Sequence, residues 1–288
     1  MANLVQYLLA RANRWHSVRS YNALVARCRR QYPGDHDMAM MASIGAVSPV
    51  EFASQGDGHV AVLRHYGLRD GMSIYDLGCG SGRTAIALQR SGWTGHYKGA
   101  DIVKPLVDYL RSKCPGYEAI VHRELTIAAA DASLDMVFHW SVFTHLYPEE
   151  CYFYMEDAFR ALRPGGRLIF SFLELEDPRH HGIFHSRLGR FRKFGWSQTL
   201  DVFLHRDWIR FWAEDIGFTD ISFTDGNDGS HHPEFWQALA AMTKPGLPDP
   251  EVSSTEHPSG DIAGWLPNQR TLSSLVAAGA KGAEVIDR

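Results

Sequence analysis

Three glycines at alternate positions form the pattern with the clearest chemical meaning in this sequence. Gly78, Gly80 and Gly82 follow the apolar run 72–77, and a helical pattern begins directly after them. Because glycine has no Cβ, the backbone can turn tightly there and a ligand can lie against it. The first turn of the following helix presents free N–H groups. The turn is therefore a candidate ligand-binding loop.

Two aspartates accompany the glycines. Asp101 ends the strand predicted at 97–101, about 20 residues beyond the turn, which is the spacing at which an acid meets the ribose hydroxyls of a nucleoside. Asp76 precedes the first glycine by two residues, where a carboxylate repels a pyrophosphate and attracts an ammonium group. Arg83 occupies the place of the third glycine of a dinucleotide-binding turn. These features disfavour NAD and favour a nucleoside with an ammonium group, such as S-adenosylmethionine.

Strands and helices alternate around these residues, which predicts a doubly wound α/β fold with a mostly parallel sheet. Strands are expected at 72–77, 97–101, 118–122, 134–140, 166–173, 218–224 and 234–242. Helices are expected at 57–66, 82–91, 104–113, 149–162 and 205–216. Only the turn 225–229 separates the last two strands, so we expect them to form an antiparallel hairpin at one edge.

Four stretches together resemble the class I S-adenosylmethionine-dependent methyltransferases of the small-molecule type. They are 75–82, 99–101, 134–138 continuing to 143–146, and 161–168. The resemblance covers residues 60–244. It implies a seven-stranded sheet whose last strand is antiparallel, with S-adenosylmethionine as the cofactor.

The resemblance also implies where the cofactor binds. The glycine-rich turn with Asp76 would surround its methionine part, and Asp101 would hold the ribose hydroxyls. Glu124 stands near the position where many members carry a Gly-Asp pair close to the adenine, and Trp140 is expected beside the sulfonium as a cation–π partner. The expected cofactor-binding residues are Asp76, Gly78, Cys79, Gly80, Gly82, Asp101, Ile102, Glu124 and Trp140.

Histidines are frequent in the loops expected at the carboxyl edge of the sheet. They are His139, His145, His180, His181, His185, His231 and His232. Histidine titrates near neutral pH and suits a general base, so His145 and His139 are the catalytic candidates. The alternative for His145, in Thr-His-Leu, is packing or helix capping. No metal site is expected from these histidines.

The predicted reaction is methyl transfer by in-line displacement to a small-molecule acceptor, at a hydroxyl oxygen. Where Asn/Asp-Pro-Pro-Tyr/Phe would signal amino-methylation of adenine or glutamine, the chain reads 139–141, His-Trp-Ser. Two alternatives stay open. One is an RNA or protein methyltransferase using the arginines of 1–30 and 179–193, which the net charge of -4 disfavours. The other is a protein that binds S-adenosylmethionine without transferring the methyl group.

Three segments are predicted. Residues 1–50 form a basic helical N-terminal extension and linker, residues 51–244 the methyltransferase domain, and residues 245–288 a tail rich in Pro, Ser and Gly. Within the domain, the arginine- and aromatic-rich insert 174–204 is predicted to be a lid that favours an anionic or aromatic acceptor, with a solvated loop as the alternative. The N-terminal helix should cover the site or pack; contact with a membrane surface or another subunit is the less favoured alternative.

Composition agrees with one large globular domain carrying modest additions, since 45% of the 288 residues are hydrophobic. The four cysteines are scattered and form no Cys-x-x-Cys pair, which indicates reduced thiols and a cytoplasmic protein. No apolar run reaches transmembrane length.

Overall fold

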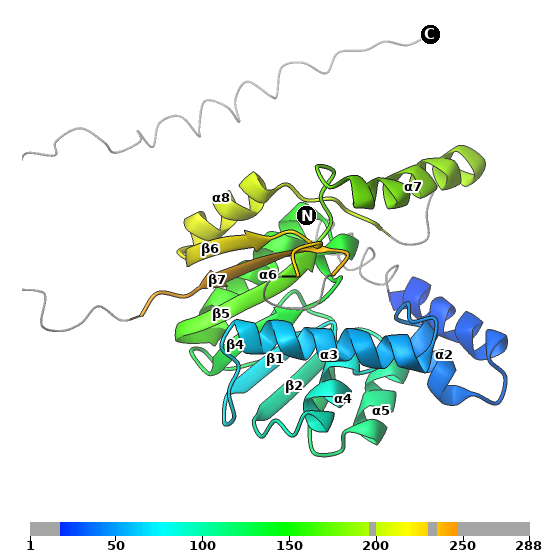
Figure 1. The fold of residues 1–288 in the computed structure, drawn as a ribbon, viewed down its shortest axis with the longest axis horizontal. Helices are drawn as coiled ribbons and strands as arrows, with labels where there is room; N and C mark the ends of the chain where they lie inside the picture. The colour runs from blue at the N-terminus through cyan, green and yellow to red at the C-terminus, as the bar shows by residue number, and fades with distance from the viewer. Residues whose placement is uncertain (1–17, 196–199, 230–234, 247–288) are drawn as a thin grey trace, which may run out of the picture. The chain divides into compact units, whose positions relative to one another are not determined.

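A seven-stranded sheet is the centre of the computed structural model, which describes residues 18–195, 200–229 and 235–246 (Figure 1). The strands are β1 Ser73–Leu77, β2 His96–Asp101, β3 Glu118–Val121, β4 Leu134–His139, β5 Leu162–Phe172, β6 Thr219–Thr224 and β7 Ala238–Thr243. Their order in the sheet is β3-β2-β1-β4-β5-β7-β6. The order reverses between β1 and β4, which is where a doubly wound sheet opens a crevice for ligands.

The strand directions confirm the expected sheet. Strand β1 is parallel to β2 and β4, β2 is parallel to β3, and β4 is parallel to β5. Strand β7 is antiparallel to both β5 and β6. The last strand is therefore inserted between its two neighbours, and β6 with β7 forms the predicted hairpin at one edge.

Helices cover both faces of the sheet (Figure 1). One face carries α3 Pro49–His65, α4 Arg83–Arg90 and α5 Lys104–Lys113, and the other carries α6 Pro148–Ala161 and α8 Arg206–Ile216. On the first face Leu63, Leu88 and Leu110 pack on the sheet, and on the second Met155 and Ile209 do so. Burial of these side chains fixes the strand ends that carry the site.

The segment 33–49, predicted as a linker, contains a helix. Helix α2, His36–Ala42, begins after Asp35, whose side chain accepts a hydrogen bond from the Met38 N–H at 2.8 Å. Helix α3 also begins earlier than predicted, because the Ser48 hydroxyl caps its first turn and proline is tolerated at a first helical position. The prolines and glycines of this segment mark helix ends rather than an extended linker.

The insert 174–204 contains a helix that the sequence did not indicate. A short 3-10 helix, η2 Pro178–His180, leads into α7, His181–Phe194, and residues 196–199 lie outside the described part. Among the described residues of the N-terminal extension, 18–31 are helical, as predicted, whereas 1–17 are not described. Val25 of this helix packs with Met40 and Leu106. Residues 230–234, which include His231 and His232, and the tail from 247 onward also lie outside the described residues.

Candidate active site

A cavity of about 470 Å³ lies at the carboxyl ends of β1, β2 and β4. Asp76 and Asp101 line it from two of these strands, and Trp140 follows the third. Tyr21 and Leu24 line it from the helix of residues 18–31. The cavity is thus formed by strand ends that face segments preceding the sheet.

The glycine-rich turn is fixed to the end of β2 by its own backbone. The N–H groups of Gly78 and Cys79 both donate to the Ala100 carbonyl, at 2.8 and 3.0 Å. Gly80 has φ +55°, and a Cβ there would lie 2.8 Å from Cγ2 of Ile44. Glycine is therefore required at this position by both backbone conformation and space.

Asp101 presents a buried carboxylate with spare acceptor capacity. One oxygen accepts from the Gly80 N–H at 2.9 Å, and the other accepts from the Val103 N–H at 2.8 Å. The Ile102 N–H also interacts with this carboxylate, whose two oxygens offer about four acceptor sites, so acceptor capacity remains for a ligand. Burial raises the pKa of Asp101 to about 6, and the backbone hydrogen bonds counteract this rise.

Asp76 is a second buried acid in the same cavity. It accepts a hydrogen bond from the Tyr97 hydroxyl at 2.7 Å. Burial raises its pKa to about 7, opposed by hydrogen bonds from Tyr97 and Thr84, while the nearby Asp101 adds to the rise. A cationic group in the cavity would stabilise the charged form of this pair of acids.

An aromatic wall stands beside the acids. The rings of His59 and Trp140 stack with centroids 4.6 Å apart, and Nδ1 of His59 lies 2.9 Å from the Thr84 hydroxyl oxygen. Burial lowers the pKa of His59 well below its ordinary value, so the imidazole is neutral at pH 7.

Two further titratable side chains that line the cavity, His145 and Tyr21, contact each other. Nδ1 of His145 lies 2.6 Å from the Leu200 carbonyl, so Nδ1 carries the proton and Nε2 presents a lone pair. Burial lowers the pKa of His145, and the bond to Leu200 counteracts this. The Tyr21 ring meets the imidazole edge-on at 5.7 Å, and its buried hydroxyl has no partner among the described residues.

Comparison with known proteins identifies the domain that holds this cavity. Residues 74–166 match the family model described as a methyltransferase domain. The chain carries a class I S-adenosylmethionine-dependent methyltransferase domain. The malonyl-[acyl-carrier protein] O-methyltransferase of Methylococcus capsulatus is 31% identical over 119 residues, which are 40% of this chain and 42% of that protein. The match thus spans less than half the length of this curated relative.

Solved structures share the fold of the methyltransferase domain. Magnesium protoporphyrin IX methyltransferase of Synechocystis PCC 6803, solved with bound SAH, has TM-score 0.50 and 18% identity over 69% of this chain and 89% of its own. An S-adenosylmethionine-dependent methyltransferase of Methanosarcina mazei has TM-score 0.51 and 18% identity over 64% of this chain and 98% of its own. At these identities the likeness concerns the fold, and it confirms the fold that the sequence resemblance implied.

The cavity fits the cofactor of such a methyltransferase domain, S-adenosylmethionine. The remaining acceptor capacity of the Asp101 carboxylate matches a ribose hydroxyl, and Asp76 matches an ammonium group. The glycine-rich turn leaves room for a ligand against its backbone. The expected residues that line the cavity are Asp76, Gly78, Cys79, Gly80, Asp101, Ile102, Trp140 and His145.

Three expected site residues of the methyltransferase domain do not line the cavity. Gly82 instead forms the N-cap of α4, with φ +87°. Glu124 accepts a hydrogen bond from the Tyr154 hydroxyl through its backbone carbonyl at 3.1 Å, and His122 of the same stretch reaches the cavity. The adenine contact expected of the Glu124 side chain is therefore not supported by its position.

His139 is the third. Its ring is 1% exposed and lies between Phe143, 4.1 Å away, and Phe170, 5.0 Å away. Neither ring nitrogen has a partner among the described residues, and burial lowers its pKa to about 3. The ring is buried and does not line the cavity, which argues against the catalytic role expected for His139.

Several residues lining the cavity of the methyltransferase domain were not expected there. Arg83 and Thr84 follow the glycines directly, and that adjacency was the available signal. Tyr21, Ile44 and His59 come from segments before β1, and nothing in their spacing marked them. Their positions depend on how the N-terminal helices pack on the domain.

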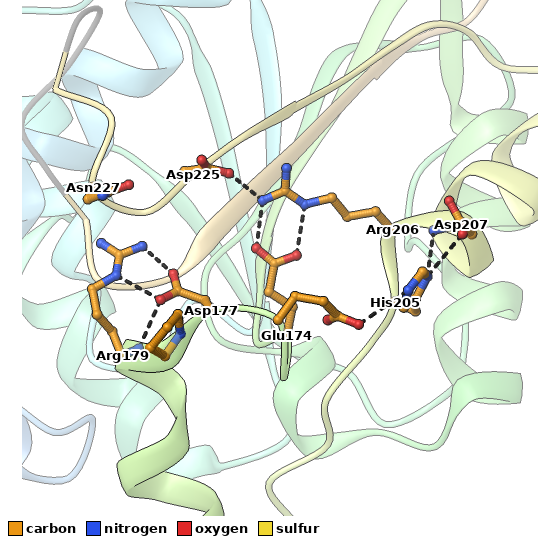
Figure 2. Close-up of a pocket in the computed structure, with 10 residues that line it drawn as sticks. Glu174, Asp177, Arg179, His205, Arg206, Asp207, Asp225 and Asn227 are labelled. Atoms are coloured by element: carbon orange, nitrogen blue, oxygen red, sulfur yellow. Dashed lines mark hydrogen bonds and ion pairs between the residues drawn. The ribbon is translucent and has the colours of Figure 1, made fainter.

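A second cavity of about 700 Å³ lies near the end of β5 and is lined mainly by charged side chains (Figure 2). The Glu174 carboxylate contacts Arg206 at 2.6 and 2.7 Å, and Arg206 also contacts Asp225 at 2.5 Å. Arg179 pairs with Asp177 in the same cavity. These charges compensate one another, so the smaller cavity remains the candidate active site.

Metal ligands do not gather in the part of the chain that the structure describes. No group of three or more His, Cys, Asp or Glu side chains there is arranged to hold a metal ion. No helix within the same residues is long and apolar enough to cross a membrane.

Proposed function

We propose that the methyltransferase domain transfers a methyl group to a hydroxyl oxygen of a small molecule, with His145 as the general base. The bound cofactor supplies an electrophilic methyl group on a sulfonium. The observation that carries the proposal is the position of His145, which lines the cavity while the Leu200 carbonyl engages its Nδ1–H, so that Nε2 is the ring nitrogen with a lone pair.

Asp101 and Asp76 would hold the two ends of the cofactor. Asp101 would accept hydrogen bonds from the ribose hydroxyls, because its carboxylate keeps acceptor capacity beyond its backbone hydrogen bonds. Asp76 would attract the ammonium group, which stabilises the charge that burial disfavours. Trp140 would face the sulfonium by cation–π attraction, supported by its place in the cavity wall.

His145 would take the acceptor proton at Nε2. A neutral imidazole is required for this step, and burial favours the neutral form by lowering the pKa of the ring. The Tyr21 hydroxyl, buried beside the imidazole, would orient the acceptor oxygen. Alignment of acceptor and methyl group supplies most of the remaining rate acceleration.

Enclosure of the cavity supports a small acceptor over a polymer. Tyr21, Leu24 and Ile44 line it from the N-terminal side. Two of the arginines that an RNA surface would use are paired with acids: Arg179 with Asp177, and Arg187 with Asp201 at 3.3 Å. The four cysteines, all free and buried, support the further proposal of a cytoplasmic protein.

Calorimetric titration tests the cofactor, and product formation tests the acceptor. S-adenosylmethionine and S-adenosylhomocysteine should bind the wild type, NAD should not, and Asp101→Ala should weaken both nucleosides by about tenfold or more. The wild type and His145→Gln would then be compared for S-adenosylhomocysteine formation on a panel of small hydroxyl compounds. Nucleoside binding without turnover on any hydroxyl, amine or RNA acceptor would instead indicate a non-catalytic binding protein.

A further inference from the structure

Arg83 is a largely buried cation that lacks a carboxylate partner. It is the first residue of α4 and lines the cavity directly after the glycine-rich turn. One Nη2–H donates to the Ile44 carbonyl at 3.0 Å. Its Nε is buried without a hydrogen-bond partner, and the guanidinium forms no ion pair with any described residue. Most of its donors are therefore unused.

Two other partly buried arginines, Arg206 and Arg160, are compensated by carboxylates. Arg206 contacts Glu174 and Asp225, and Arg160 contacts Asp157 and Asp131. Burial lowers the pKa of Arg83 to about 10; the charge of Glu51 opposes this shift without forming an ion pair with the guanidinium. A desolvated guanidinium with free donors favours an anionic ligand, and its planar fork matches a carboxylate.

The surroundings of Arg83 fix its side chain at the methionine end of the proposed cofactor site. The guanidinium lies over the Phe52 ring, with its central carbon 5.5 Å from the ring centroid. The Ile44 carbonyl holds one edge of the group. The acid Asp76 lines the same cavity from the strand before the turn. One cavity thus presents a cation and an anion, which suits the carboxylate and ammonium groups of an amino acid.

We infer that Arg83 binds the α-carboxylate of the cofactor's methionine part through paired N–H···O hydrogen bonds. The inference rests on the proposed function, in which this cavity holds S-adenosylmethionine. It makes Arg83 a specificity-determining residue that distinguishes an amino-acid nucleoside from a nucleoside without the carboxylate.

Three ligands allow the contributions of the carboxylate and the ammonium group to binding to be measured separately. S-adenosylmethionine carries both charged groups of the amino acid, decarboxylated S-adenosylmethionine keeps only the ammonium, and methylthioadenosine lacks both. Calorimetric titration would be made with wild type, Arg83→Met, Arg83→Lys and the control Arg90→Met. Arg90 lies on the same helix, but it pairs with Asp57 and is not a cavity residue.

The wild type should bind S-adenosylmethionine roughly 10- to 100-fold more tightly than the decarboxylated ligand. Arg83→Met should remove this difference by weakening S-adenosylmethionine alone, with methylthioadenosine affected less than about twofold. Arg83→Lys should restore part of the difference, because it keeps the charge without the planar fork. Arg90→Met should behave as the wild type.

Two results would overturn the inference, and a third would overturn the proposed cofactor site. If Arg83→Met weakens all three ligands to the same extent, Arg83 only holds the Ile44 segment in place and the inference is overturned. If S-adenosylmethionine and its decarboxylated form bind the wild type equally, the carboxylate has no partner and the inference is again overturned. If the wild type binds neither S-adenosylmethionine nor methylthioadenosine, the proposed cofactor site itself fails. Should Arg83→Met not fold, Arg83→Lys carries the same comparison.

Discussion

Replacing Asp76 with asparagine should stabilise the ligand-free protein at alkaline pH. Burial raises the pKa of this carboxyl from 3.8 to about 7, so between these values the folded chain holds a proton that the unfolded chain has released. The resulting stabilisation is complete below about pH 4 and is lost as the pH rises through 7. The full change is on the order of 4 kcal/mol, of which about 2.5 kcal/mol falls between pH 5 and pH 8.

Urea unfolding of wild type and Asp76→Asn at both pH values measures this effect. The amide carries no charge, so the difference between the two free energies of unfolding should grow by about 2.5 kcal/mol from pH 5 to pH 8. Taking the difference removes the contributions of His59 and His139, whose pKa values burial lowers. The control Asp108→Asn, on a half-exposed pair with Lys104, should give a constant difference. A constant difference for Asp76→Asn would refute the reasoning.

Three further outcomes are expected. His145→Gln should lower turnover by roughly 100-fold or more while leaving S-adenosylhomocysteine affinity nearly unchanged, which kinetics and calorimetry separate. Because burial lowers the pKa of His145 from 6.5, the acid limb of kcat/KM should lie below pH 6.5; a limb near pH 7.5 contradicts this. Gly80→Ala should lower the free energy of unfolding by roughly 1 to 3 kcal/mol in urea titrations. The added Cβ would meet Ile44, so Ile44→Ala should recover part of that loss, and no recovery would point to backbone strain alone.

The ligand-binding turn could be predicted from the sequence because its function resides in the backbone. Gly78 and Gly80 mark a conformation that few other residues adopt, and Asp101 follows at the end of the next strand. Parallel strands bring these positions to one edge whatever the details of packing. The mostly parallel sheet followed from the alternation of strands and helices, and the antiparallel last strand from the short turn 225–229 and the family resemblance.

Side-chain direction at a strand end could not be read in the same way. His139 is the last residue of β4 and His145 lies six residues later, so their sequence positions alone do not show which of the two reaches the cavity. Phe143 and Phe170 pack around the ring of His139, whereas the 3-10 helix Phe143–His145 places His145 in the lining of the cavity. Only the arrangement of aromatic side chains from different elements separates the two.

The N-terminal part of the site was hidden for a related reason. Tyr21 and His59 lie on helices whose orientation is set by contacts far along the chain, such as Val25 against Leu106. Proline and glycine at 33–49 signalled an irregular connection, yet Asp35 caps a helix there. Proline, glycine and capping residues indicate where helices begin and end, but they do not indicate which face of a helix lines a cavity.

The two walls of the cavity come from parts of the chain that are held in place by different numbers of neighbours. The strand ends belong to the sheet, where each position is tied to neighbours on both sides and tolerates little change. Tyr21, Leu24 and Ile44 belong to short helices and a turn that pack mainly through one small cluster. Substitutions at Tyr21, Leu24 or Ile44 can therefore reshape this wall, and with it the space left for an acceptor, while the strand ends that hold the nucleoside keep their geometry.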